Sequence, residues 1–386
     1  MAKLGEVFPV IRNGASIKQE SGAGGFPITR IETISNRTVN RSKMGYAGIF
    51  DIEKYQDYVL QDGDILMSHI NSEAHLGKVA LYAKQGNEQI IHGMNLLMLR
   101  SNSKKLLPEY AKCYFESWSF LRQIQRITKK SVNQASFTVT ALKEVEIPCV
   151  DIDVQKEIVK RLQKLEQLIS LRKQQLVKLD DLVKARFVEM FGDINVNNKK
   201  WMTHPLGELC TIVRGGSPRP IERYLGGTIP WIKIGDATTG ENIYLNSTKE
   251  YIIQEGVKKS RMIKAGSLIF ANCGVSLGFA RIITFDGCIH DGWLAMEDID
   301  EKLDKIFLLY SLNQMTEYFR KTAPAGTQPN LNTNIMKMHR QIVPPMEMQK
   351  AFISFVKCAD RQKQIVQQSL EKLELMKKEL MQEYFG

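Results

Sequence analysis

The sequence predicts an α+β protein in which two similar α/β globular domains alternate with two long helices that form an antiparallel coiled coil. A helical run at residues 155–192 recurs without a gap at residues 349–386, with the same offset at both ends, 349 − 155 = 194 and 386 − 192 = 194. Ten positions of this window are identical, whereas average composition would give roughly two. Paired strand and turn motifs precede both runs. The chain is therefore an internal repeat around an approximate two-fold axis.

Each half opens with a short strand followed by a turn, at residues 10–16 and again at 212–218. Both turns combine Gly and small hydroxyl groups with basic or amide side chains. The candidate phosphate contacts in them are Arg12, Asn13 and Ser16 in the first half, and Arg214, Ser217 and Arg219 in the second. Turns also need Gly for their own geometry, so a purely structural role is the alternative.

Two further pairs of segments read as strands. Residues 26–31 and 229–234 alternate between apolar and polar residues, which predicts half-buried strands, with Arg30 and Lys233 on polar positions. Residues 63–68 and 266–271 read as a turn into a buried strand, and 76–80 and 277–281 as the hairpin partner of each.

A helical segment follows in each half, at residues 109–125 and 304–320, with aromatic side chains on one face. Such a stripe favours a place in the core over a base-stacking surface. The next segment of each half is polar, at 129–136 and 326–332, and we expect a loop. Its amides and lysines suit base edges and phosphates, although plain turns have the same composition. The candidate DNA contacts are Lys129, Lys130, Asn133, Gln134, Thr327, Gln328, Asn330 and Asn332.

Apolar residues in the two long runs recur at steps of four and three, which is the spacing of a coiled-coil seam. The residues predicted to pair the helices are Ile158, Leu162, Leu165, Ile169, Leu176, Leu179 and Val183 in the first run, and Val356, Val366, Leu370, Leu373 and Leu380 in the second. Where Arg172 and Lys363 interrupt one seam, the other carries Val366 and Ile169 at the matching positions. This favours packing of the two helices on each other, the alternative being that each packs only on its own domain. A second apolar line, including Leu171 and Leu182, would contact another subunit or a flanking domain.

The predicted organisation is a domain at 1–152, a helix at 153–192, a linker at 193–205, a second domain at 206–346 and a second helix at 347–386. The linker of thirteen residues reaches at most about 43 Å, whereas a helix of this length spans roughly 55 Å. The linker cannot easily return to the start of the first helix. The second domain should therefore begin near the far end of that helix, and antiparallel packing follows.

The composition is that of an ordinary globular protein with a basic surplus. Lys and Arg number 53 against 42 Asp and Glu, which gives a net charge of +11 and favours a polyanionic partner. The six Cys residues show no metal-ligand spacing, so reduced thiols are expected. The sequence has no apolar run of membrane-spanning length and no signal-peptide core. We therefore expect a cytoplasmic protein without membrane contact.

Motifs of catalysis are missing from the sequence. It contains no phosphate-binding P-loop, no dinucleotide-binding glycine motif after a strand, and no Asn-Pro-Pro-aromatic motif of an adenine methyltransferase. The Gly-rich residues 22–25 lack the required context. His69, Asn71, Glu73 and His75 lie close together in the sequence, but without a second cluster they are better explained as strand or loop residues than as a metal site. No cofactor is expected in this chain.

Taken in order, these features resemble the specificity subunit of type I restriction-modification systems, over nearly the whole chain. The motifs that carry the resemblance are Leu-Gly-Glu at 4–6 and 206–208, Gly-Asp-Ile-Leu at 63–66, Ile-Pro-Trp-Ile at 229–232, Gly-Thr-Gln at 326–328, and Pro-Pro followed by Gln-Lys at 344–350. Each is only moderately specific, whereas their duplicated order is highly specific. The first half departs from the pattern, with Ser-Val-Asn-Gln at 131–134 in place of Gly-Thr-Gln and no second Pro at 149–153.

The resemblance implies that each globular domain reads one half of an asymmetric, bipartite site in double-stranded DNA. It implies that the paired helices set the spacer between the half-sites and dock two modification (methyltransferase) subunits, which would hold S-adenosylmethionine. A restriction (translocase and nuclease) subunit can join such a complex. Two other interpretations remain, namely a self-contained DNA-modifying enzyme and a coiled-coil scaffold without DNA affinity.

Overall fold

The computed structural model describes residues 1–19, 24–131, 134–238, 243–274, 276–324 and 330–386. The chain divides into two compact units, one built from residues 1–172 and 369–386 and the other from residues 173–368. Each long helix is one element of 40 residues, α5 (Ile152–Phe191) and α11 (Met346–Phe385). Each contributes one stretch to each unit, so a unit consists of a globular domain and a pair of helical stretches.

The helical stretches of the first unit pack antiparallel. Arg161 of α5 donates from Nη1 to the hydroxyl of Tyr384 at 3.2 Å, and Arg172 donates from Nε to the hydroxyl of Ser369 at 3.1 Å. The contact on α11 thus moves toward lower residue numbers as the contact on α5 moves toward higher ones. This is the order that antiparallel helices require.

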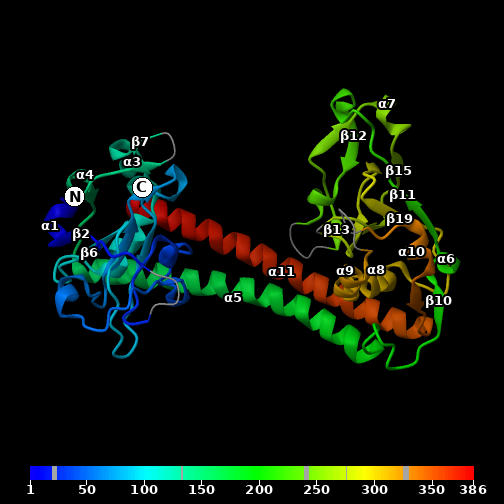
Figure 1. Cartoon of the computed structure of the whole chain (residues 1–386), viewed down its shortest axis with the longest axis horizontal. Coiled ribbons are helices and arrows are strands. Elements are labelled where there is room, and N and C mark those ends of the chain that lie inside the picture. The colour runs from blue at the N-terminus through cyan, green and yellow to red at the C-terminus, as the bar shows by residue number, and fades with distance from the viewer. Residues whose placement is uncertain (20–23, 132–133, 239–242, 275, 325–329) are drawn as a thin grey trace. The chain divides into compact units, whose positions relative to one another are not determined.

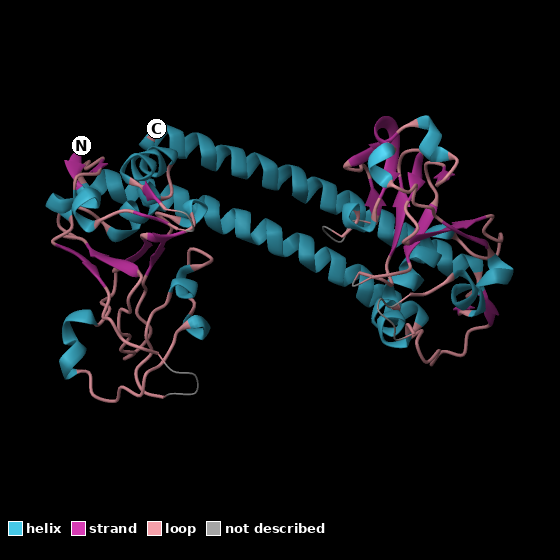
Figure 2. Ribbon diagram, turned by 45° about the horizontal axis from the view of Figure 1, so that its top comes forward, coloured by secondary structure: helices cyan, strands magenta, loops and turns pink. Residues whose placement is uncertain are grey.

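The second unit shows the same direction of packing. Asp180 of α5 forms an ion pair with Lys363 of α11, and further along α5 the ring of Phe187 lies 5.3 Å from the ring of Phe352. Within each unit the two stretches lie side by side (Figures 1 and 2). The predicted antiparallel coiled coil is confirmed.

The predicted seam residues face inward in this packing. Seven are buried, namely Ile158, Leu162, Leu165, Val183, Val356, Val366 and Leu370. The others are half-buried, namely Ile169, Leu176, Leu179, Leu373 and Leu380. Of the second apolar line, Leu171 and Leu182 remain 51% and 50% exposed. These two side chains of α5 therefore remain largely in solvent.

The first domain is built around a four-stranded antiparallel sheet in the order β2 (Val10–Asn13), β6 (Leu96–Arg100), β3 (Ile65–Ser68), β5 (Val79–Leu81). All four residues of strand β3 are buried. Because successive side chains of a strand point in opposite directions, both faces of the sheet are covered at this strand. Ile65 and Met67 pack with the helices of the domain and with α5, whereas Leu66 joins a cluster on the opposite face. The smaller elements are β1 (Ala2–Lys3) paired with β9 (Glu146–Ile147), and helices α1 (Leu4–Val7), α2 (Pro108–Phe115), α3 (Trp118–Ile127) and α4 (Val139–Lys143).

The second domain repeats this sheet with one added strand, in the order β11 (Thr211–Arg214), β19 (Trp293–Glu297), β16 (Leu268–Ala271), β17 (Ala280–Ile283), β13 (Tyr244–Leu245). Leu268 and Phe270 of β16 pack toward the helices, and Ile269 packs on the other face. A second sheet contains β14 (Glu250–Ile252), β12 (Leu225–Ile232), β18 (Gly287–Ile289) and β15 (Arg261–Ile263). The helices are α6 (Leu206–Leu209), α7 (Gln254–Val257), α8 (Lys305–Gln314), α9 (Thr316–Thr322) and α10 (Thr333–Met338).

Several predicted elements differ in the structure. The single helix expected at 109–125 is two helices, because Ser117 accepts a hydrogen bond from Phe120 N and caps a new helix there. Its counterpart is likewise divided into α8 and α9. The aromatic stripe is mostly core, but Trp118 is 63% exposed. The strand expected at 26–31 is reduced to isolated bridges at Ile28, next to another at Gly25.

The polar segments also have more structure than predicted. In the segment expected as a loop, β7 (Lys129–Lys130) pairs antiparallel with β8 (Ala135–Ser136), and β8 pairs in turn with β4 (Ile70–Asn71). The linker is not free chain, because its last residues form β10 (Thr203–Pro205), paired with β20 (Arg340–Ile342). Ile194 is buried, and Trp201 donates its indole N–H to the carbonyl of Phe191 at 2.9 Å. None of the described helices combines the length and the apolar character that crossing a membrane requires.

Candidate nucleic-acid interface

In both domains the turn after the first strand of the main sheet, β2 or β11, packs on the turn that precedes β6 or β19, the strand paired with it. In the first domain Ala15 N donates to the carbonyl of His92 at 2.8 Å, and in the second Gly216 N donates to the carbonyl of Ile289 at 3.0 Å. These two hydrogen bonds occupy matching positions of the two sheets. The domains therefore hold two turns together in the same way.

A glycine allows this close approach in both domains. A Cβ atom on Gly14 would lie 2.0 Å from the carbonyl oxygen of Gly93, and one on Gly215 would lie 2.2 Å from that of His290. Both distances are shorter than any real Cβ contact, so a larger residue would push the turns apart. The glycines thus have the structural role that was the alternative to phosphate binding, while their neighbours stay available.

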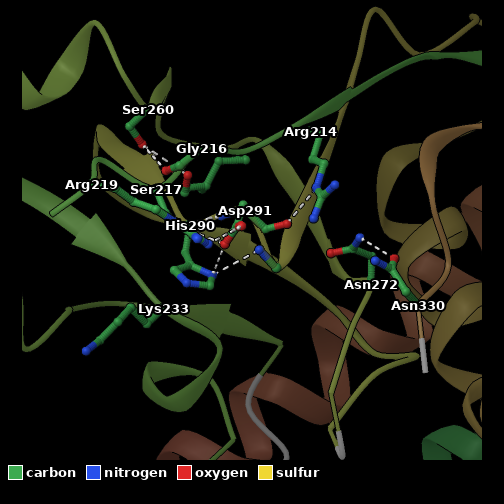
Figure 3. A network of polar contacts seen from close by, with 12 residues as sticks. Arg214, Gly216, Ser217, Arg219, Lys233, Ser260, Asn272, His290, Asp291 and Asn330 are labelled. Carbon is green, nitrogen blue, oxygen red and sulfur yellow. Dashed lines mark hydrogen bonds and ion pairs between the residues drawn. The ribbon is translucent and has the colours of Figure 1, made fainter. Parts of the chain in front are cut away.

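In the second domain Asp291 is the centre of a polar network that includes three of the predicted residues (Figure 3). Arg214 donates from Nε to the backbone carbonyl of Asp291 at 2.9 Å, and Ser217 donates from its hydroxyl to Asp291 Oδ1 at 2.8 Å. Arg219 Nη2 lies 3.9 Å from Asp291 Oδ2, and its side chain is 83% exposed. The structure brings Arg214, Ser217 and Arg219 together around one residue, with Arg214 at its backbone carbonyl and the other two at its carboxylate.

His290 has a defined tautomer in this network. Its Nδ1 accepts a hydrogen bond from Gly292 N at 2.9 Å and lies 3.1 Å from Asp291 Oδ1. Nδ1 cannot serve both groups, because an atom that accepts from an N–H carries no proton itself. Burial lowers the pKa of His290 despite the charge of Asp291, which agrees with the hydrogen bond to Gly292. The neutral ring then carries its proton on Nε2 and packs 5.5 Å from the Trp231 ring.

A pair of amides lies beside this network. Asn272 is fully buried, and it donates from Nδ2 to Oδ1 of Asn330 at 3.1 Å. Its own Oδ1 is buried without a hydrogen-bond partner among the described residues. The predicted Asn332 caps α10 by accepting from Ile335 N at 3.0 Å, which gives it a structural role. Thr327 and Gln328 lie outside the described residues.

Lys233 is part of the same domain but is engaged by an acidic neighbour. Its ammonium group forms an ion pair with Glu250 and lies 5.6 Å from the centre of the Trp231 ring. The indole nitrogen of Trp231 is buried and has no partner among the described residues. Lys233 therefore belongs to the surroundings of His290 and Trp231, and not to the turn that contains Ser217.

In the first domain the matching turn carries different chemistry. Arg12 donates from Nη1 to the carbonyl of Asp57 at 3.1 Å, and its guanidinium lies 4.1 Å from the centre of the Tyr58 ring. The Ser16 hydroxyl lies 4.0 Å from the sulfur of Met94. Asn13 and Arg30 are exposed, and Arg30 Nε lies 3.5 Å from Glu32. Arg12, Asn13 and Ser16 thus share one turn, and Arg30 lies elsewhere in the domain.

The hairpin β7–β8 holds the remaining candidates of the first domain. Lys129 is exposed, and Lys130 forms an ion pair with Glu73 at 2.9 Å. The carbonyl of Gln134 accepts from Ser131 N at 2.8 Å, so the Gln134 side chain is not needed to close the hairpin. Asn133 lies outside the described residues.

His69 occupies in the first domain the place that Asn272 has in the second. Each follows the central strand, and each accepts at its backbone carbonyl, from Phe137 N at 3.2 Å and from Leu331 N at 2.7 Å. Burial lowers the pKa of His69 to about 4, and Nδ1 has no partner among the described residues. The buried ring is therefore neutral at pH 7. No cluster of metal-ligating side chains occurs in the described part of the chain.

His290, Asp291, Asn272 and Met94 are not among the residues that the sequence predicts as contacts. Ser217 and Asp291 are 74 residues apart, and Asn272 and Asn330 are 58 apart. The register of β11 against β19 joins the first pair, and an isolated bridge between Cys273 and Asn330 joins the second. One signal was available, because the strands β6 and β19 were identifiable by their apolar runs. Met94 and Asp291 lie two positions before these strands, at the edge of the sheet that carries the paired turn.

The comparisons with known proteins identify the family of the chain. Residues 1–180 and 198–375 match a protein family described as the type I restriction modification DNA specificity domain. The chain is 31% identical over 395 residues to a putative type I restriction enzyme MjaX specificity subunit of Methanocaldococcus jannaschii, an alignment that covers 98% of this chain and 91% of the relative. It is 26% identical over 156 residues to the EcoKI specificity subunit of Escherichia coli K12, covering 40% of this chain and 33% of that protein.

Two solved structures share the fold. One comes from a study of complex assembly and conformational transition of the type I restriction-modification system, with a TM-score of 0.65, 17% identity, and coverage of 100% of this chain and 96% of that one. The other is the type I specificity subunit of M. genitalium, with a TM-score of 0.54, 14% identity, and coverage of 100% and 95%. At these identities the likeness concerns the fold alone.

Proposed function

Since the chain belongs to the family of type I restriction-modification DNA specificity subunits, we propose that each of its two domains reads one half of an asymmetric, bipartite site in double-stranded DNA. The observation that carries this proposal is the duplicated pair of turns. Both domains keep the glycine and the backbone hydrogen bond that hold the turns together, but the side chains around them differ. A common frame with different side chains suits two readers of different sequences.

The contacts proposed in each domain divide by chemistry. Arg12, Arg214 and Arg219 carry guanidinium groups, which suit phosphates and guanine edges. Ser16, Ser217 and Asn330 are shorter, and they suit base edges or phosphate oxygens at close range. The weaker candidates are Arg30 and Lys233, which have acidic neighbours, and Asn332, which caps a helix. Lys129, Lys130, Asn133, Gln134, Thr327 and Gln328 remain proposals for the loops that follow the small helices.

We propose that the readers are residues 1–152 and 206–346, and that the linker 193–205 connects the first long helix to the second reader. The helices at 153–192 and 347–386 would set the spacer between the half-sites and dock two methyltransferase subunits. Support for docking comes from exposed apolar residues on α5, with Val177 60% and Leu182 50% exposed, since exposed apolar lines mark interaction surfaces. A restriction subunit would join indirectly, through the methyltransferases, where the system encodes one.

Within this proposal the chain is not itself an enzyme, and it works in the cytoplasm. Methyl transfer to an adenine extruded from the duplex would belong to the partner subunits, which would bind S-adenosylmethionine. The family places this chain among specificity subunits, and the sequence lacks the methyltransferase motif. A methylation assay of the purified chain with S-adenosylmethionine and no partner should therefore show no transfer.

The central test compares two single variants in the assembled complex. We expect Asn330→Ala to change the base preference of the second half-site only, and Arg12→Ala to weaken recognition of the first half-site only, because each residue belongs to one domain. Duplexes selected from a randomised library, or methylated adenines mapped in cells, report both half-sites at once. Equal weakening of both half-sites by either variant would contradict the proposal, and absence of DNA binding by the wild-type complex would favour a scaffold.

A further inference from the structure

Met94 and Asp291 occupy the same position in the two domains. Each lies one residue after the site of the close glycine contact, since Gly93 faces Gly14 and His290 faces Gly215. Each also meets the serine of the neighbouring turn, Ser16 at 4.0 Å and Ser217 at 2.8 Å. The two domains thus present a thioether and a carboxylate from one matched place, beside residues already proposed as DNA contacts.

The Asp291 carboxylate has capacity for a further hydrogen bond. Oδ1 accepts from Ser217, whereas Oδ2 lies 3.9 Å from Arg219 Nη2, which exceeds hydrogen-bond length. The side chain keeps 31% of its surface exposed. Among the described residues, no donor therefore lies within hydrogen-bond distance of Oδ2.

Charge decides which part of a duplex such a group can face. A carboxylate repels phosphate, so Asp291 cannot lie against the DNA backbone. The guanidinium groups of Arg214 and Arg219 on either side of it attract phosphate, and they would offset this repulsion while the carboxylate faces the groove. The amino groups available there are N4 of cytosine and N6 of adenine.

Met94 offers the opposite chemistry. Its side chain is 43% exposed, it is uncharged, and its flexible thioether packs on irregular apolar surfaces. The apolar group of the major groove is the C5 methyl of thymine. A matched position with a methionine in one domain and an aspartate in the other would therefore favour different bases.

From these contacts we infer that Met94 and Asp291 are specificity-determining residues, one for each half-site. Asp291 accepts a hydrogen bond from the exocyclic amino group of a cytosine or an adenine in the second half-site, and Met94 contacts the methyl group of a thymine in the first. This inference rests on the proposed function, because it requires that each domain reads one half-site.

The experiment measures base preference by the complex of the whole chain with its methyltransferase partners, using duplexes selected from a randomised library. Asp291→Asn retains an oxygen for Ser217 but loses the charge, and it should relax discrimination at one base pair of the second half-site by about 5- to 150-fold. The first half-site should not change. Glu255→Gln, which removes the same charge from an exposed position of α7 in the same domain, should change neither.

Base analogues test the same contacts on the wild-type protein, independently of how any variant folds. If the base read by Asp291 is adenine, replacing it by purine, which lacks the amino group, should weaken binding as Asp291→Asn does. Replacing one thymine of the first half-site by deoxyuridine should weaken binding about fourfold, the value of one methyl group removed from water. With Met94→Ala that effect of deoxyuridine should disappear.

The outcomes separate this inference from the proposal beneath it. A wild-type complex that discriminates at both half-sites, combined with an Asp291→Asn variant that discriminates equally well, would overturn the role of Asp291 alone. A uniform loss across all positions would show a structural role and would also overturn it. A wild-type complex with no preference at the second half-site would instead overturn the proposed function.

Discussion

Gln155 and Gln349 explain why the two repeats begin alike. Gln155 is fully buried; its Oε1 accepts from Leu107 N at 2.9 Å, and its Nε2 donates to the carbonyls of Lys105 and Val150 at 2.9 and 2.7 Å. Gln349 makes the three equivalent hydrogen bonds in the second unit, at 2.8, 2.9 and 2.8 Å. One side chain thus ties the start of each long helix to the globular domain before it.

Replacing this side chain should be costly. Gln155→Leu has nearly the same volume but leaves a backbone donor and two carbonyls without partners, so the free energy of unfolding should fall by about 2–4 kcal/mol. Gln163→Leu, at an exposed position of the same helix, should change it by less than about 0.5 kcal/mol. Urea denaturation followed by circular dichroism measures both. Equal effects of the two variants would show that the buried hydrogen bonds are not what matters.

Two carboxylates at matching positions of the long helices should affect the stability of the fold with opposite signs. Glu166 of α5 lies 2.6 Å from Lys377 of α11 and 3.8 Å from Lys112. Burial acts to raise the pKa of Glu166, but the hydrogen bond from Lys377 and the charge of Lys112 outweigh it, and the pKa is lowered from 4.5. The charged form of Glu166 therefore stabilises the first unit.

The matching position of the second repeat is Asp360, since 360 − 166 = 194. Burial raises the pKa of Asp360 from 3.8, and the nearby charge of Asp180 adds to the rise. Lys363 lies 3.7 Å from Asp360 but pairs more closely with Asp180. The charged form of Asp360 is thus less favourable in the folded protein than in the unfolded chain.

At pH 7 we therefore expect Glu166→Gln to lower the stability of the first unit and Asp360→Asn to raise that of the second. Both groups are partly exposed, so each change should be at most about 1 kcal/mol. The stability from Glu166 is present above pH 4.5 and is lost as pH falls through its lowered pKa. The cost of Asp360 is present above its raised pKa and vanishes below pH 3.8. Urea titrations at pH 7 and pH 3 test this, and effects of the same sign would contradict it.

At the scale of the whole molecule, the net charge of +11 should appear in the salt dependence of DNA binding. Contacts to phosphate release counterions, so their number sets the slope of the logarithm of affinity against the logarithm of salt concentration. Contacts to bases carry sequence preference with little effect on that slope. The two kinds of contact can therefore be separated within one protein.

Lys129 and Asn330 provide the comparison. In the assembled complex Lys129→Gln should reduce the magnitude of the slope by about 0.9, the value of one phosphate contact, and leave base preference unchanged. Asn330→Ala should leave the slope unchanged and alter base preference. Binding isotherms at several salt concentrations on cognate and random duplexes give both quantities. An unchanged slope for Lys129→Gln would show that Lys129 of the hairpin does not contact phosphate.

The sequence was sufficient for the architecture because repetition and periodicity are visible along the chain. The ungapped repeat of the two long runs, the spacing of Leu162 and Leu165, and the short linker predicted two antiparallel helices. The paired strands at 65–68 and 268–271 were predicted from apolar runs. The strand expected around Ile28 was wrong, and the break at Ser117 was missed. At Ser117 a single capping hydroxyl outweighs the helical pattern of its neighbours.

By itself the sequence determined the two-fold repeat, the direction of helix packing and the family. Only the tertiary structure decided which side chains share a site, because sheet register brings together residues such as Ser217 and Asp291 that no local pattern connects. It also decided that Asn332 caps a helix and that Lys233 has an acidic partner. Periodicity records which face of an element is buried, whereas contacts between distant segments depend on how those buried faces are joined.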